Sequence, residues 1–183
     1  MTDKCGDAWA SKIEGENIEE IQKPQKILGH CSVILDTKLN QSCTKIITSD
    51  RDEKIRVSCF PQGFIIQNYL LGHKEAVVTV ELLRNEQFLL SIDIDGICKL
   101  WSLDGRLDNY KKNSCIQTNN LFDLLQLDSD SGLEGNSKES SKFEVYTMKV
   151  VESPNKDNSL CLALKITLYS KVPIFELNMR SYI

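Results

Sequence analysis

The chain has 183 residues, 41% of them hydrophobic, and a formal net charge of −4, which is enough for one domain with a modest core but argues against a free-standing nucleic-acid binder. No apolar run approaches the roughly 20 residues that span a bilayer, and the N-terminus lacks the apolar stretch of a secretory signal, so no membrane association is expected. Seven cysteines without a Cys-x-x-Cys pair, and only two histidines, argue against a metal site and favour reduced thiols in an intracellular protein.

Residues 1–26 begin with Asp3-Lys4-Cys5-Gly6, a turn sequence, and continue into a polar, charged stretch over 12–26 that contains Pro24. We expect a connecting loop over this stretch.

An internal repeat follows, over residues 27–71 and 72–110. Gly29-His30 recurs as Gly72-His73, 43 residues later, and the same offset aligns the intervening residues without a gap. The aligned pairs include Thr48 with Ser91, Asp50 with Asp93, Asp52 with Asp95, and Arg56 with Lys99. A period of about 40 to 45 residues, with Gly-His at its start and a tryptophan near its end, is typical of a WD-repeat β-propeller blade. Residues 1–26 then hold the remnant of a preceding blade.

Short β-rich runs separated by polar turns predict the strands of each blade. The expected strands are 33–35, 45–48, 55–57 and 64–66 in the first repeat, and 76–83, 88–92 and 97–102 in the second. Residues 111–142 are expected to form a loop, disordered over 129–142, with one or two helical turns over 120–127. Residues 143–183 predict a third, degenerate blade with strands at 143–150, 160–168 and 172–177.

Each repeat has a polar set that is expected to hydrogen-bond across its strands. The sets are His73, Ser91, Asp95 and Trp101 in the second repeat, and His30, Thr48 and Asp52 in the first, where Ser58 replaces the tryptophan. A hydrolase triad is the alternative for these residue types. The order fits the blade instead, and no nucleophile-elbow sequence is present.

The fold class predicted is therefore all-β, a WD-repeat propeller represented by about three blades. Propellers close with at least four blades, so we expect a truncated chain or an incomplete gene model. No catalytic residues, cofactor site or nucleotide-binding motif is predicted from the sequence.

Residues 49–58 form the most unusual segment, a hairpin in which five consecutive residues are charged and an arginine follows shortly after. These charged residues are Asp50, Arg51, Asp52, Glu53, Lys54 and Arg56. The second repeat has Gly96 where this hairpin has Glu53. A dense mixed-charge hairpin offers donors and acceptors to a complementary surface. The residues alone leave open the alternative of a solvated turn held by internal ion pairs, although exposed pairs add only about 0–1 kcal/mol each.

These segments resemble the WD-repeat non-catalytic subunit of the eukaryotic tRNA (guanine-N7) methyltransferase, the Wuho family. The resemblance rests on Leu28-Gly29-His30, on the run from Ile47 through Asp-Arg-Asp-Glu-Lys-Ile-Arg to Ser58, and on Leu71-Gly72-His73. It is strong over residues 28–103 and weaker over 3–7 and 143–177. The first and last blades of the family's propeller have no counterpart here.

The resemblance implies a seven-bladed propeller that docks and stabilises a separate catalytic subunit in a heterodimer. That partner would bind S-adenosylmethionine and methylate N7 of a guanine in the tRNA variable loop, so contact with tRNA would be indirect. Contact residues carried over from the family are Lys4, Glu53 and Arg56, with Arg51 and Lys54 beside them. Arg56 is expected to pair with a carboxylate of the enzyme, and Glu53 with a lysine or arginine. Nuclear residence is implied, with the cytoplasm left open.

A competing hypothesis is a general WD scaffold, such as a substrate receptor of a ubiquitin ligase, which would be indifferent to changes at Glu53 and Arg56. A third, an enzyme in its own right, is disfavoured by the absence of a cofactor motif.

Overall fold

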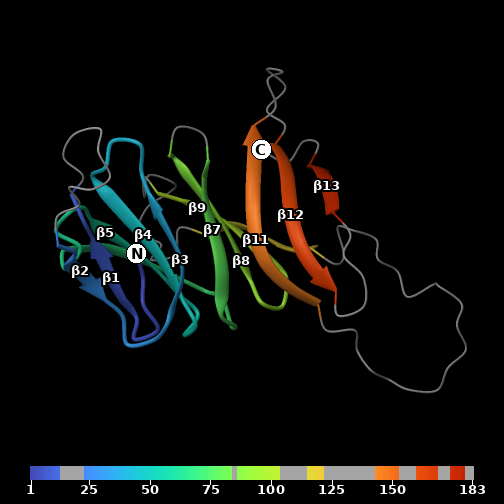
Figure 1. Cartoon of the computed structure of the whole chain (residues 1–183). Coiled ribbons are helices and arrows are strands. Elements are labelled where there is room, and N and C mark those ends of the chain that lie inside the picture. Colours follow the sequence, from blue (N-terminus) through green and yellow to red (C-terminus); the bar gives the residue numbers. More distant parts are fainter. Residues whose placement is uncertain are drawn as a thin grey trace, which may run out of the picture.

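The computed structural model describes residues 1–12, 23–83, 86–103 and 115–121, together with the backbone of three strands further along the chain. In these residues the chain forms antiparallel sheets that follow one another in sequence order (Figure 1). The first sheet pairs β1 (Asp7–Ala10) with β2 (Gln25–Gly29). The second contains β3 (Ile34–Leu39), β4 (Lys45–Asp50), β5 (Lys54–Cys59) and β6 (Ile66–Leu71) in that spatial order.

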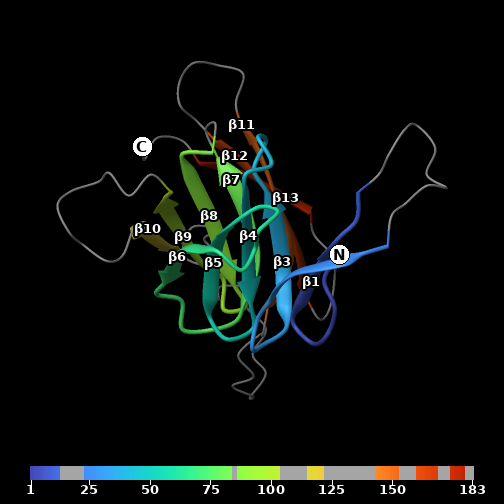
Figure 2. The same ribbon diagram turned by 90° about the vertical axis from the view of Figure 1, so that its left-hand side faces the viewer.

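The third sheet is a second four-stranded meander, and the fourth has three strands. The third contains β7 (Val77–Leu83), β8 (Phe88–Asp93), β9 (Ile97–Ser102) and β10 (Cys115–Asn120). The fourth contains β11 (Phe143–Glu152), β12 (Leu160–Leu168) and β13 (Ile174–Met179). β3 packs against β7, and β7 against β11, so the first strands of successive sheets lie side by side. The sheets are arranged one behind another when the molecule is turned (Figure 2). This is the arrangement of propeller blades, and it confirms the predicted fold class.

Asp36 joins the inner strands of the second and third sheets. Its Oδ2 accepts hydrogen bonds from the Thr79 hydroxyl at 3.0 Å and the Val80 amide at 2.9 Å. Nearby, Lys38 and Glu81 form an ion pair between the same two strands. Polar contacts as well as packing therefore hold β3 of the second sheet against β7 of the third sheet.

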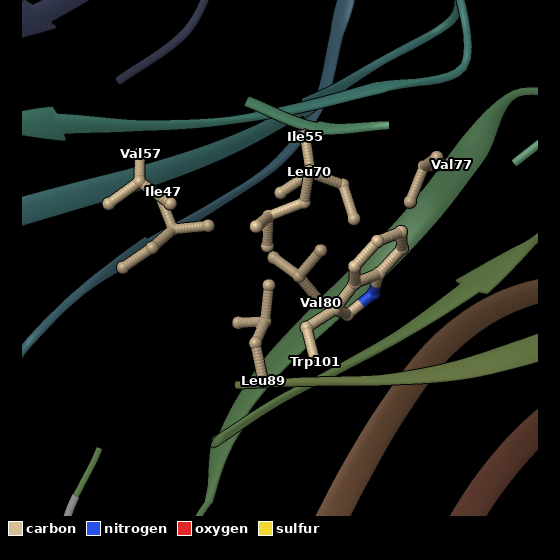
Figure 3. Close-up of a cluster of buried hydrophobic side chains, with 8 residues drawn as sticks. All are labelled: Ile47, Ile55, Val57, Leu70, Val77, Val80, Leu89 and Trp101. Atoms are coloured by element: carbon tan, nitrogen blue, oxygen red, sulfur yellow. The ribbon is translucent and has the colours of Figure 1, made fainter. Parts of the chain in front are cut away.

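The core lies between the sheets rather than within one of them (Figure 3). The second sheet contributes Ile47, Ile55, Val57 and Leu70, and the third contributes Val77, Val80, Leu89 and Trp101. A smaller cluster between the first and second sheets contains Ala8, Leu28, Ile34 and Ile46. Each large apolar side chain buried in this way contributes about 1.5–3 kcal/mol. Strand alternation produces the pattern, because Ile55 and Val57 share one face of β5.

Two predicted boundaries are corrected by the structure. β2 pairs with β1, so residues 25–29 complete the first sheet, although the repeat pattern predicted that the next blade begins at residue 27. β10 pairs with β9, so part of the predicted 111–142 loop is the fourth strand of the third sheet. β10 is polar because it is an outer edge strand, and it therefore carries little of the apolar signal used to find strands.

The fourth strand of the second sheet begins at Ile66, and the Phe64-Ile65 part of the predicted strand lies in the preceding turn. Hydrogen bonds from the Ile65 amide to the Gln62 carbonyl and from the Gly63 amide to the Pro61 carbonyl close that turn. The predicted strands near the C-terminus fall on β11, β12 and β13. The predicted helical turns over 120–127 and the loop over 129–142 lie outside the described residues, except for Asn120, which ends β10, and Leu121.

In the described part of the chain no helix is long and apolar enough to cross a membrane. The same residues contain no group of three or more histidine, cysteine or acidic side chains that could hold a metal ion.

Candidate protein-docking surface

Three equivalent turns lead into β1, β5 and β9, one in each of the first three sheets. We call them the first turn (residues 3–7), the charged turn (50–54) and the third turn (93–97). Each begins with an aspartate whose Oδ1 accepts a hydrogen bond from the backbone amide four residues later. These bonds are Asp7 N to Asp3 at 3.0 Å, Lys54 N to Asp50 at 3.0 Å and Ile97 N to Asp93 at 2.9 Å. Because the three turns share this geometry, residues at the same place in each turn can be compared directly.

The fourth residue of each turn has a left-handed backbone. Its φ is +86° at Gly6, +75° at Gly96 and +68° at Glu53. Glycine adopts this conformation freely, whereas a residue with a Cβ is strained in it. The charged turn therefore carries a glutamate where its two equivalents use glycine. Strain of this kind clusters at functional positions, which makes Glu53 a candidate contact residue.

The tips of the first and charged turns present charges to solvent. Lys4, Arg51 and Glu53 are all exposed. Within the described residues, none of these three side chains has a hydrogen-bond or ion-pair partner. Lys54 donates to the Asp52 carbonyl at 3.1 Å and forms a long ion pair of 4.0 Å with the Asp52 carboxylate. A turn stabilised by internal ion pairs would pair Arg51 and Glu53 as well, so the geometry favours a surface that is open to an external partner.

The first turn and the charged turn are linked through the backbone of residues 30–33. The His30 amide donates to the Gly6 carbonyl at 2.8 Å, and the Arg51 amide donates to the Val33 carbonyl at 3.0 Å. A Cβ on Gly6 would lie 2.2 Å from the Ser32 carbonyl oxygen, so the first turn packs directly on this segment. Lys4 and the charged turn are consequently held on one face of the molecule.

A buried hydrogen-bond network lies beneath the third turn. His73 Nδ1 lies 2.7 Å from Asp93 Oδ2, and His73 Nε2 lies 2.7 Å from Ser91 Oγ. The Trp101 indole donates to the same Ser91 Oγ at 2.7 Å. With Nδ1–H donating to the carboxylate, the serine hydroxyl donates to Nε2 and accepts from the indole, which satisfies all the groups. Ser91 is fully buried, so its hydroxyl is a structural group with no access to a substrate.

The equivalent network in the second sheet joins His30 to Asp50 at 2.9 Å and to Thr48 at 2.8 Å. The acids of the two networks are thus Asp50 and Asp93, and the predicted Asp52 and Asp95 are wrong. Both of those residues are exposed in the turns. Asp50 and Asp93 instead lie two residues after Thr48 and Ser91, on the same face of their strands, and can reach the histidine ring. Strand alternation could have shown this from the sequence.

The electrostatics of Asp50 follow from this position. Burial raises the pKa of its carboxyl, but hydrogen bonds from the His30 ring and the Lys54 amide more than offset it, so the pKa lies below the usual 3.8. The ionised carboxylate therefore anchors the start of the charged turn.

Arg56 departs from the expectation of an exposed docking charge, because it is only 6% exposed. Its Nε donates to Ser58 Oγ at 2.8 Å and its Nη1 to the Gly29 carbonyl at 3.0 Å, while its Nη2 donates to the Gly63 carbonyl. No carboxylate of the described residues pairs with it. The guanidinium thus binds the first sheet to the second, and Ser58, which occupies the position of Trp101, accepts one of its bonds.

Successive antiparallel sheets that share this turn and this histidine network define a WD-repeat propeller domain. The family model of the tRNA methyltransferase TRM82 WD40 domain matches residues 6–180, and the chain belongs to that family.

Among curated relatives, the tRNA (guanine-N(7)-)-methyltransferase non-catalytic subunit wuho of Drosophila grimshawi is 41% identical over 102 residues, which are 56% of this chain and 25% of that protein. The non-catalytic subunit TRM82 of Debaryomyces hansenii is 32% identical over 165 residues, covering 87% of this chain and 35% of that protein. TRM82 of Meyerozyma guilliermondii is 30% identical over 185 residues, covering 98% of this chain and 43% of its own length. The chain spans between a quarter and 43% of the length of these relatives.

Proposed function

We propose that this chain is a docking element of a non-catalytic subunit that binds and stabilises the catalytic subunit of a tRNA (guanine-N7) methyltransferase. The observation that carries the proposal is Glu53, a strained acidic residue at a turn position where both equivalent turns have glycine. Membership in the TRM82 family supports the choice of partner, because the relatives are named non-catalytic subunits of that enzyme.

Docking is electrostatic at its rim. Lys4 and Arg51 offer positive charges to carboxylates of the partner, and Glu53 accepts from a lysine or arginine. Lys54 adds a further positive charge beside them. Arg56 acts as a positioning residue, because its hydrogen bond to the Gly29 carbonyl holds β5 against the first sheet and its bond to the Gly63 carbonyl fixes the turn before β6. The charges are therefore ordered before the partner arrives, which lowers the entropy lost on binding.

The chemistry belongs to the partner in this proposal. The catalytic subunit would bind S-adenosylmethionine and form N7-methylguanosine in the tRNA variable loop, and contact with tRNA would be made through the heterodimer. Nuclear residence is part of the same proposal, and microscopy of the fluorescently tagged chain would test it.

Co-expression with the catalytic subunit tests the proposal. We expect the unaltered chain to co-purify with that subunit and to raise N7-methylguanosine formation in tRNA. Glu53→Lys should weaken co-purification and reduce the gain in methylation, most strongly at low salt, because it places a positive charge against the basic residue of the partner.

Asp95→Lys is the matched control, since it reverses an exposed acid in the third turn and changes the net charge equally. It should leave binding intact. Binding that survives Glu53→Lys would rule out the charged turn as the docking site and would favour a general WD scaffold.

A further inference from the structure

Two exposed apolar side chains lie beside the charged turn on β6. In the pairing of β5 with β6, Lys54 is opposite Leu71 and Arg56 is opposite Tyr69. Side chains of directly paired residues lie on the same face of a sheet. Leu71 is therefore next to the last residue of the charged turn, and Tyr69 is one step further along the same face. We call Tyr69 and Leu71 the apolar pair.

The face that carries the apolar pair is the one directed toward the first sheet. Arg56, opposite Tyr69, donates to the Gly29 carbonyl of β2, whereas Ile55 and Leu70 point the other way into the core between the second and third sheets. Leu70 is 1% exposed, but Tyr69 is 39% exposed and Leu71 is 48% exposed. The strand thus buries one apolar side chain and leaves its two neighbours in solvent.

The third sheet provides an internal comparison. The positions opposite Lys99 and Ile97, which are equivalent to those opposite Arg56 and Lys54, are Thr118 and Asn120 on β10. An outer strand of this architecture therefore accepts polar residues at both positions. The fold does not require a tyrosine and a leucine here, and their exposure calls for a separate explanation.

We propose that the apolar pair is the dry centre of the surface that binds the partner, with the charged turn forming part of its polar rim. This inference deepens the proposed function and rests on it. Protein interfaces place aromatic and aliphatic anchors at the centre and charges around them. The continuity of Leu71 with Lys54 and the charged turn matches that plan.

The occupant is a segment of the catalytic subunit that presents an apolar side chain between a basic residue and an acidic one. The basic residue would face Glu53, and the acidic residue would face Lys54. The two parts of the surface then act differently. Charges steer association and weaken with salt, whereas burial of the apolar pair slows dissociation and persists at high salt.

The test uses the full chain and the purified catalytic subunit, with binding titrated at low and high salt. The double variant Tyr69→Thr with Leu71→Asn copies the residues of the third sheet and should leave the fold intact, as thermal unfolding would show. We expect binding about 10- to 100-fold weaker at both salt concentrations. Glu53→Lys should give a loss that is large at low salt and smaller at high salt.

Ile116→Thr is the matched control, because Ile116 is a 44% exposed apolar residue on β10, at the end of that strand away from the third turn. It should bind as the unaltered chain does.

If the double variant binds normally while Glu53→Lys does not, the apolar pair is excluded and the proposed function stands. If the unaltered chain fails to bind, both proposals fall. If the double variant changes only self-association, the occupant is a second copy of this chain and the inference is overturned.

Discussion

Glu53 makes the charged turn less stable than its two equivalents, because its φ of +68° disfavours any residue with a Cβ. Glu53→Gly should raise the free energy of unfolding by about 0.5–1 kcal/mol, after allowing for the greater freedom of glycine in the unfolded chain. The same variant should lose partner binding. Urea denaturation and co-purification measure the two effects, and a variant that is both less stable and fully able to bind would contradict the role assigned to Glu53.

Asp50 and Asp52 are close in sequence but differ in what they support. Asp50→Ala would leave the His30 ring and the amides of Asp52 and Lys54 without their acceptor, and we expect a loss of about 2–3 kcal/mol. Asp52→Ala removes an exposed side chain and should change stability by less than about 0.5 kcal/mol. Urea denaturation midpoints measure both effects. A larger loss of stability in Asp52→Ala than in Asp50→Ala would contradict the assignment of Asp50 to the network.

That misplacement shows what the sequence could reveal about single residues. The 43-residue offset aligns Asp50 with Asp93 and Asp52 with Asp95 equally well, so the repeat alone cannot choose between them. The choice depends on which face of the strand each side chain occupies. Burial of Arg56 could not be predicted for a related reason, because a guanidinium that donates to the backbone carbonyls of Gly29 and Gly63 leaves no motif in the sequence.

At the scale of the element, β5 separates two different environments. Ile55 and Val57 pack into the core on one face, while Arg56 on the other face donates to carbonyls of β2 and of the turn before β6. Arg56→Ala should lower stability by about 2–4 kcal/mol, through lost hydrogen bonds and lost packing of the side-chain stem.

Arg56→Lys tests whether charge or geometry is responsible. A lysine keeps the charge, but its single ammonium cannot reach three acceptors arranged around a guanidinium. We expect most of the stability loss to remain, with partner binding retained below the melting temperature. Full stability in the lysine variant would argue that the charge alone is sufficient.

Strands were predictable where their sequence alternated and their surroundings were buried. β4, β5, β8 and β9 lie close to their predicted positions because their apolar residues face the core. β10 was missed because both of its faces are polar or partly exposed, and the start of β6 was misplaced because Phe64-Ile65-Ile66 has strand propensity inside a turn. Outer strands bury few of their side chains, as β6 shows with Leu70 alone buried, so the prediction failed at the edges of the sheets.

At the scale of the whole molecule, stability depends on contacts between sheets. Trp101 is fully buried among side chains of both the second and the third sheet, so Trp101→Ala should lower stability by about 3–5 kcal/mol. Hydrogen exchange should show lost protection in β5 as well as in β9. Trp101→Phe, which loses the bond to Ser91 but keeps most of the packing, should have a smaller effect, and loss of protection confined to β9 would indicate that the sheets unfold independently.

The left-handed backbone at Glu53 also has an evolutionary consequence. A glutamate codon becomes a glycine codon by a single base change, and that change would relieve the strain in the turn. Selection for stability alone would therefore favour glycine at this position, and under the proposed docking role the use of the carboxylate would oppose that selection. We expect copies of this gene that have lost their partner to carry glycine here. The residue at position 53 would then indicate whether the protein still binds its partner.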